Sequence, residues 1–82
     1  MAIPLYAFVR GDTLGLVVLA PEAERVDELA LRLLRAAAPR VALRGPLRVL
    51  FDGRPLRGEQ TLLEAGLAAL DRVELVMESD LA

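Results

Sequence analysis

The sequence predicts an α+β fold in which one long helix packs across one face of a mixed β-sheet. Three observations predict it: two β-rich runs precede a single helical stripe, an Asp-Gly pair separates two later extended segments, and an apolar run follows near the end. The 82 residues provide for one small domain, which we assign to residues 1–82.

The first two β-rich segments, Ile3–Arg10 and Thr13–Leu19, are separated by the turn residues Gly11 and Asp12. We therefore expect them to form an antiparallel hairpin. Successive side chains of a strand point to opposite faces, so the odd-numbered residues of the first segment share one face and the even-numbered residues share the other. Gly15 in the second segment indicates a bulge or a close backbone approach.

A helical repeat replaces the β pattern between Glu22 and Ala38, and we expect the long helix there. Pro21 lies near its first turn, where a missing N–H costs nothing, and Pro39 ends it. The apolar residues recur at spacings of three and four and make one stripe, which we expect to face the sheet: Val26, Leu29, Ala30, Leu33, Leu34 and Ala37.

The second half of the chain begins with the apolar run Leu47–Phe51, which Asp52-Gly53 interrupts. An Asp-Gly pair between two extended segments predicts a tight hairpin turn, because Gly readily takes a positive φ. The returning arm, Arg54–Leu56, contains a Pro and should lie at a sheet edge. Val73–Met77 is the last predicted strand, parallel to the first strand at the centre of the sheet.

A single helical turn is predicted between these strands. Thr61 and Glu64 form a Thr-x-x-Glu capping box, and Gly66 supplies a stop signal two residues later. A ferredoxin-like α+β domain is the alternative architecture, but it needs a second full-length helix near Leu62. Gly58 and Gly66 leave too little room for one.

The composition excludes several classes of function. The chain contains no Cys and no His, so disulfides, Cys/His zinc sites and Ser-His-Asp triads are ruled out. A formal net charge of −2 without any Lys gives no field that would attract nucleic acid. No segment reaches the roughly 18 consecutive apolar residues of a membrane span, so we predict a soluble, cytoplasmic protein that binds neither membrane nor nucleic acid.

Carboxylate pairs are the remaining source of acid–base or metal chemistry. The acidic residues at issue have structural roles instead: Asp27 and Glu28 lie on the solvated helix face, Asp52 lies in a turn and Glu64 caps a helical turn. We therefore predict that the chain is not an enzyme, and we assign no catalytic residue, no metal ligand and no cofactor. The other carboxylates considered are Asp12, Asp71 and Glu74.

The sheet face away from the helix is predicted to be apolar, where a solvated face would be polar. The alternation places Tyr6, Phe8 and Val76 there, together with either Val49 or Leu50. Large exposed apolar patches on small domains mark partner sites, so we predict a partner-binding surface on this face. Its residues are Tyr6, Phe8, Leu50 and Val76, ringed by Arg10, Arg48 and Glu74. The alternative is that the strand phases are shifted by one residue and these side chains fill the core.

The segment Leu47–Met77 resembles the second half of a ubiquitin-like β-grasp. Residues 3–49 are similar to the small B (gamma-type) subunits of bacterial toluene and related aromatic monooxygenase hydroxylases. Those subunits open with a short aliphatic-Pro-aliphatic strand, place an LVV-type strand after a charged Asp turn, and carry a basic, Pro-containing loop, here residues 39–44. They also carry a T-x-x-E-x-G-L segment, here Thr61–Leu67. The Ala- and Leu-rich helix departs from their pattern.

The resemblance implies a ubiquitin-like accessory subunit of a complex for aromatic hydrocarbon catabolism. Its partner would be the large hydroxylase subunit, where the di-iron centre and the chemistry reside. The resemblance implies no metal ligand, cofactor or catalytic residue in this chain. A ubiquitin-like interaction module of another bacterial complex, such as a secretion system, is the alternative within the same fold.

Overall fold

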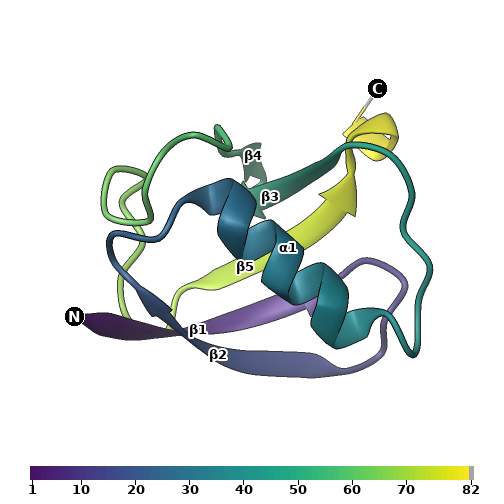
Figure 1. The fold of residues 1–82 in the computed structure, drawn as a ribbon, viewed down its shortest axis with the longest axis horizontal. Helices are drawn as coiled ribbons and strands as arrows, with labels where there is room; N and C mark the ends of the chain where they lie inside the picture. The colour runs from purple at the N-terminus through teal and green to yellow at the C-terminus, as the bar shows by residue number, and fades with distance from the viewer. Residues whose placement is uncertain (82) are drawn as a thin grey trace.

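The computed structural model describes residues 1–81, in which a five-stranded sheet carries one α-helix across one face (Figure 1). The strand order is β2-β1-β5-β3-β4, with β1 and β5 parallel at the centre and the other neighbours antiparallel. This confirms the predicted α+β class, the first hairpin and the central parallel pair. The elements are β1 (Ala2–Val9), β2 (Gly15–Pro21), α1 (Val26–Ala37), β3 (Leu47–Phe51), β4 (Arg54–Pro55), β5 (Arg72–Met77) and the 3-10 turn η1 (Glu78–Leu81).

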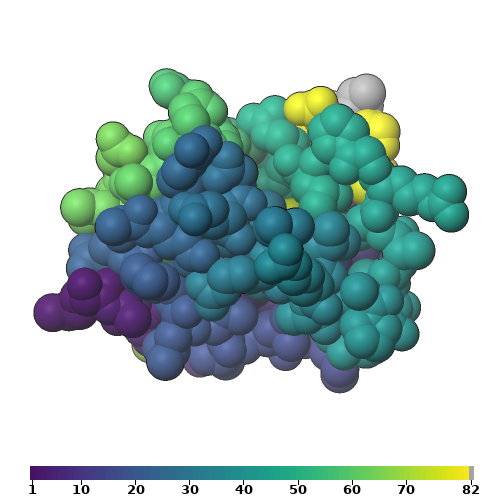
Figure 2. Space-filling view, viewed as in Figure 1, coloured from purple at the N-terminus to yellow at the C-terminus, as the bar shows by residue number. Residues whose placement is uncertain are grey.

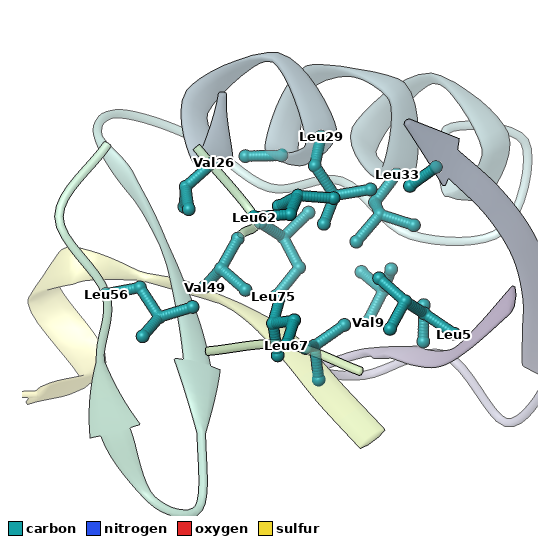
Figure 3. Close-up of a cluster of buried hydrophobic side chains, with 14 of the residues drawn as sticks. Leu5, Val9, Val26, Leu29, Leu33, Val49, Leu56, Leu62, Leu67 and Leu75 are labelled. Carbon is teal, nitrogen blue, oxygen red and sulfur yellow. The ribbon is translucent and has the colours of Figure 1, made fainter. Parts of the chain in front are cut away.

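The core lies between α1 and the sheet, and it consists of Leu, Val and Ala side chains (Figure 3). The predicted phase of β1 is confirmed, because Leu5, Ala7 and Val9 are at most 2% exposed. Leu29 and Leu33 point from α1 toward the sheet, and both are fully buried. Fully burying one such side chain stabilises the fold by roughly 1.5–3 kcal/mol, so this single apolar layer is the main source of stability.

The helix starts at Val26, four residues later than the sequence predicts, and ends at Ala37 close to its predicted end. The residues before it serve another segment. The carbonyl oxygens of Glu22 and Glu24 accept hydrogen bonds from the N–H groups of Leu63 and Leu62, at 3.1 and 2.9 Å. These carbonyls bond to the distant loop in place of the next helical turn, and α1 begins after them.

The hairpin turn between β3 and β4 has the predicted geometry. Asp52 and Gly53 have φ angles of 53° and 74°, so both central residues are left-handed, as in a type I′ turn. The turn returns the chain into a strand of only two residues, in which Arg54 pairs with Phe51 and Pro55 pairs with Leu50. The short, Pro-containing edge strand is therefore confirmed.

The segment between β4 and β5 contains one capped turn and no second α-helix. The Thr61 N–H donates to Glu64 Oε1 at 2.9 Å, and the Glu64 N–H donates to Thr61 Oγ1 at 3.1 Å, which is the predicted capping box. Gly66 follows with a φ of 83°. The turn places Leu62 in the core with no exposed surface. The ferredoxin-like alternative is thereby excluded for the described residues. The predicted polar tail forms η1 as far as Leu81, and Ala82 lies outside the described residues.

Candidate docking face

The predicted partner-binding residues all lie on the sheet face that α1 leaves open. On β1 they alternate with the core residues, and the ladder places Phe8 beside Glu74 of β5. On the other side of β5, Arg48 pairs with Val76 and Leu50 pairs with Glu74. The face predicted from the alternation is therefore the face observed, and the structure brings together Tyr6, Phe8, Arg10, Arg48, Leu50 and Val76.

Two of these residues are buried, which corrects the prediction of a continuous exposed patch. Val76 has no exposed surface and Leu50 is only 8% exposed. Val76 pairs with Arg48 on β3, and Arg10 follows the ladder on its other side. We attribute the burial to these arginines, whose aliphatic stems can cover apolar neighbours while their charged ends stay in water.

Ion pairs hold the two arginines over this half of the face. Arg10 lies 3.2 Å from Glu74, and Arg48 lies 3.3 Å from Glu78 in η1. A second Arg48 nitrogen donates to the carbonyl oxygen of Leu56 at 3.2 Å. The half of the open face formed by β5 and β3 is therefore charged at its surface, although its side chains beneath are apolar.

Phe8 is fixed in place at the boundary of the charged half. The Arg72 guanidinium lies 4.7 Å from the centre of its ring, a distance typical of a cation–π contact. On the β2 side the ring packs against Gly15, since a Cβ atom added there would lie 2.8 Å from Phe8 Cε1. The close approach expected at Gly15 is thus confirmed, and Phe8 is only partly exposed.

The exposed apolar surface lies instead on β1 and β2. Tyr6 is 41% exposed and lies directly opposite Val17, which is 66% exposed. Leu19, opposite Pro4, is 64% exposed. We call Tyr6, Val17 and Leu19 the β1–β2 patch. The sequence analysis did not assign Val17 and Leu19, although a signal was present: residues 16–20 are all apolar, so one face of that strand had to be apolar outside the core.

A groove of about 290 Å³ lies on the helix side, between α1 and β3. Its apolar lining includes Val26, Ala30 and Leu31 of α1, Leu47 of β3, and Leu56. Leu31, which falls outside the apolar stripe of the helix, is 45% exposed at this groove.

The acidic side chains have partners that account for their positions. Both carboxylate oxygens of Asp12 accept hydrogen bonds from Arg40, at 2.9–3.0 Å, and these bonds hold the pKa of Asp12 below its ordinary value of 3.8. Hydrogen bonds from Thr61 lower the pKa of Glu64 in the same way. Within residues 1–81, no group of three or more acidic side chains is placed to hold a metal ion. None of the helices there is long and apolar enough to cross a membrane.

Comparison with solved structures identifies the fold. A chain of the toluene 4 monooxygenase HD complex with the inhibitor 4-bromobenzoate superposes with a TM-score of 0.87 at 24% identity, covering 95% of this chain and all of that one. The ubiquitin of Caldiarchaeum subterraneum superposes with a TM-score of 0.80 at 16% identity, covering 95% of each chain. A designed protein based on ubiquitin gives 0.78 at 22% identity, covering 95% of this chain and 90% of that one.

This chain is a ubiquitin-like β-grasp domain. No protein-family model matches the sequence, and no curated protein sequence does. The β-grasp identification agrees with the observed order of elements, in which one hairpin precedes the helix and a strand with a short edge partner follows it. A β-grasp with a single helix necessarily leaves one sheet face open, so the β1–β2 patch is a consequence of the architecture as well as of the sequence.

Proposed function

We propose that this β-grasp chain is a non-catalytic accessory subunit that binds the large di-iron hydroxylase subunit of a multicomponent aromatic monooxygenase. The superposition on a chain of the toluene 4 monooxygenase complex supports this proposal, because it covers the whole of that chain and 95% of this one. The resemblance of the Thr61–Leu67 segment and of the first hairpin to the small hydroxylase subunits points the same way.

The open sheet face is the surface that we assign to this partner. The β1–β2 patch of Tyr6, Val17 and Leu19 supplies exposed apolar area. Exposed apolar patches on small domains often mark protein–protein contacts. Arg10 and Arg48 supply charge at the rim of the contact. Phe8 contributes its exposed part, while Leu50 and Val76 support the arginines from beneath. Six of the residues of this surface are those proposed from the sequence: Tyr6, Phe8, Arg10, Arg48, Leu50 and Val76.

The accessory role is also supported by the state of the polar side chains. General acid–base work requires a carboxyl group that is free to exchange a proton with a substrate. Asp12 is bound to Arg40, Glu64 caps a turn, and Glu74 is paired with Arg10. We assign these groups to the stability of the fold, and we assign the chemistry of the complex to the partner.

Co-purification tests the proposal. A tagged large hydroxylase subunit encoded beside this chain would be expressed with it, and the two should co-elute from a sizing column. Val17→Asp should abolish co-elution, because it places a charge in the centre of the patch. Leu63→Asp is the matched control, since Leu63 is 62% exposed but lies outside the sheet, and it should leave co-elution unchanged. Failure of the unmodified pair to co-elute would contradict the proposal.

A module of another bacterial assembly, such as a secretion system, is the second candidate. The observation that favours it is the superposition on an archaeal ubiquitin over 95% of both chains, which shows that the fold is not particular to monooxygenases. Purification of this chain from its native host under mild conditions distinguishes the two functions. Retention of a secretion component in place of a hydroxylase would select the second.

A further inference from the structure

The outer edge of β2 carries backbone groups that no strand within residues 1–81 pairs with, because β2 ends the strand order. The direction of these groups follows from β1. The Tyr6 N–H donates to Asp71 O, and Pro4 O accepts from the Leu70 N–H, so both residues direct their backbone groups away from β2. Their antiparallel partners Val17 and Leu19 therefore direct theirs to the outer edge.

The residues of β2 itself supply few of the devices with which proteins usually protect exposed strands, such as charges, prolines, bulges or very short length. Residues 15–20 include no charged residue and no Pro, and Pro21 stands only at the end of the strand. The opposite edge is protected, since β4 has two residues, Arg54 and Pro55. In Figure 2 the atoms of β2 lie uncovered along the lower border of the molecule. Of the two edges of the sheet, the β2 edge is therefore the one that is open to pairing with an added strand.

One side chain from α1 reaches this edge and indicates the charge of what covers it. An Arg32 nitrogen donates to Leu19 O at 2.8 Å, and the other lies 2.6 Å from Glu24. A strand added to β2 would take Leu19 O for its own N–H and would free part of the guanidinium beside it. A carboxylate on the added strand is the group that best satisfies that released donor.

In the antiparallel pairing centred on Val17, a second copy of this chain does not offer such a carboxylate. An antiparallel pairing of two β2 strands about Val17 would place Leu19 of one copy opposite Gly15 of the other. The nearest acid before Gly15 is Asp12, whose oxygens are both bound to Arg40 and whose side chain is 1% exposed. The charge at Arg32 therefore favours a different protein over self-association.

We propose that β2 accepts an extended segment of the partner protein as an additional strand of the sheet. This segment carries apolar side chains that contact Val17 and Leu19, and an acidic side chain that contacts Arg32. Main-chain hydrogen bonds to Val17 and Leu19 supply affinity, and the side chains supply specificity. The inference rests on the proposed function for the identity of the partner, and it assigns the mode of binding and the chemistry of the bound segment.

A synthetic peptide tests this mode directly. The probe is a short capped peptide that alternates valine and threonine between two glutamates, and the matched peptide has glutamine in place of each glutamate. Amide hydrogen exchange measured by NMR should slow at Val17 and Leu19 when the glutamate peptide is added. The glutamine peptide should bind the unmodified chain more weakly than the glutamate peptide does. The Arg32→Gln variant should bind the two peptides with equal affinity.

Two variants of Val17 separate the edge from the side chain. Val17→Pro removes the outward N–H without breaking the ladder to β1. It should lower the affinity for the glutamate peptide about tenfold or more. Val17→Thr keeps the N–H and loses only apolar side-chain contact, so it should weaken binding of the glutamate peptide less than Val17→Pro does. Thermal unfolding of each variant verifies the fold, and the exchange measurement on the unmodified chain stands on its own if Val17→Pro does not fold.

The remaining outcomes would contradict either the proposed strand addition at β2 or the proposed function. The proposed strand addition at β2 is overturned if amide exchange at Val17 and Leu19 does not change when the peptide is added. It is also overturned if the free chain dimerises and the same amides are protected. If the large hydroxylase subunit co-elutes with both Val17→Pro and the unmodified protein, the proposed function is retained. The proposal that the partner pairs with β2 is then rejected. Peptide binding through β2 without hydroxylase co-elution retains the edge and rejects the proposed function.

Discussion

Tyr6 on β1 and Val17 on β2 lie directly opposite each other on the open face of the sheet, and both side chains reach solvent. The Tyr6 N–H bonds to Asp71 O on the other side of β1, so this is a non-hydrogen-bonded pair across the hairpin. Side chains of such pairs approach most closely, so the two residues present one joined apolar surface. On the same face, the ion-paired Arg10, directly after β1, and Arg48, on β3, lie over the half formed by β5 and β3.

The contrast between the two halves of the face predicts losses of stability of different size when the same substitution is made at Val76 and at Val17. Val76→Ala should lower the free energy of unfolding by about 2 kcal/mol, because Val76 is fully buried and the methyl groups lost leave a void. Val17→Ala, the matched control at a residue 66% exposed, should lower it by less than about 0.5 kcal/mol. Urea unfolding of both variants measures the difference. Equal losses would mean that Val17 is also buried in solution.

Phe8 and Gly15 should be coupled, because the ring occupies the space of an absent side chain. Gly15→Ala should cost about 1 kcal/mol or more, since the new Cβ would lie 2.8 Å from the ring, which Arg72 holds from the other side. In a Phe8→Leu background the same substitution should cost less. A double-mutant cycle by denaturant unfolding measures this coupling. Additive effects would show that the ring does not press on Gly15.

The contact between Asp12 and Arg40 predicts a dependence of stability on pH. The folded pKa of Asp12 is depressed, so its contribution is present above the unfolded value of about 3.8 and is lost as pH falls through the folded value. The unmodified chain should exceed Asp12→Asn in stability at neutral pH, and this advantage should shrink below a pH of about 3.8. Glu59 and Glu64 also have depressed pKa values, and both remain in the variant, so the difference isolates Asp12. A constant difference across the acid range would contradict the assignment.

Local signals in the sequence predicted the strands, the turn at Asp52-Gly53 and the capped turn at Thr61, because each depends on residues a few positions apart. The helix α1 starts four residues after the predicted Glu22, since the carbonyls of Glu22 and Glu24 bond to Leu63 and Leu62, which are distant in the sequence.

In the candidate site too, features set by neighbouring residues could be predicted, and features set by distant residues could not. Alternation placed Val76 on the correct face, but we attribute its burial to Arg48 on β3 and to Arg10, which directly follows β1. No periodicity within β5 carries that information. The exposed residues Val17 and Leu19 could have been assigned from the sequence, since an edge strand that is apolar at five successive positions must expose some of them.

Leu70 stores backbone strain in the turn that precedes β5. Its φ of 69° is left-handed, a conformation that costs a non-glycine residue roughly 1–2 kcal/mol, and its side chain is 58% exposed. Its N–H bonds to Pro4 O, so the strained residue lies beside the β1 strand that carries Tyr6. Leu70→Gly should therefore raise the free energy of unfolding by up to about 1 kcal/mol, since little packing is lost and the strain is relieved.

Leu63→Gly is the matched control for this change. Leu63 is 62% exposed and has no positive φ, so glycine there should lower stability by roughly 0.5–1 kcal/mol through the entropy of the unfolded chain. Urea unfolding compares the two variants, and equal losses would show that packing of Leu70 outweighs its strain. If Leu70→Gly stabilises the free chain yet weakens its association with the large subunit, the exposed leucine side chain contributes to the docking face at a cost in stability.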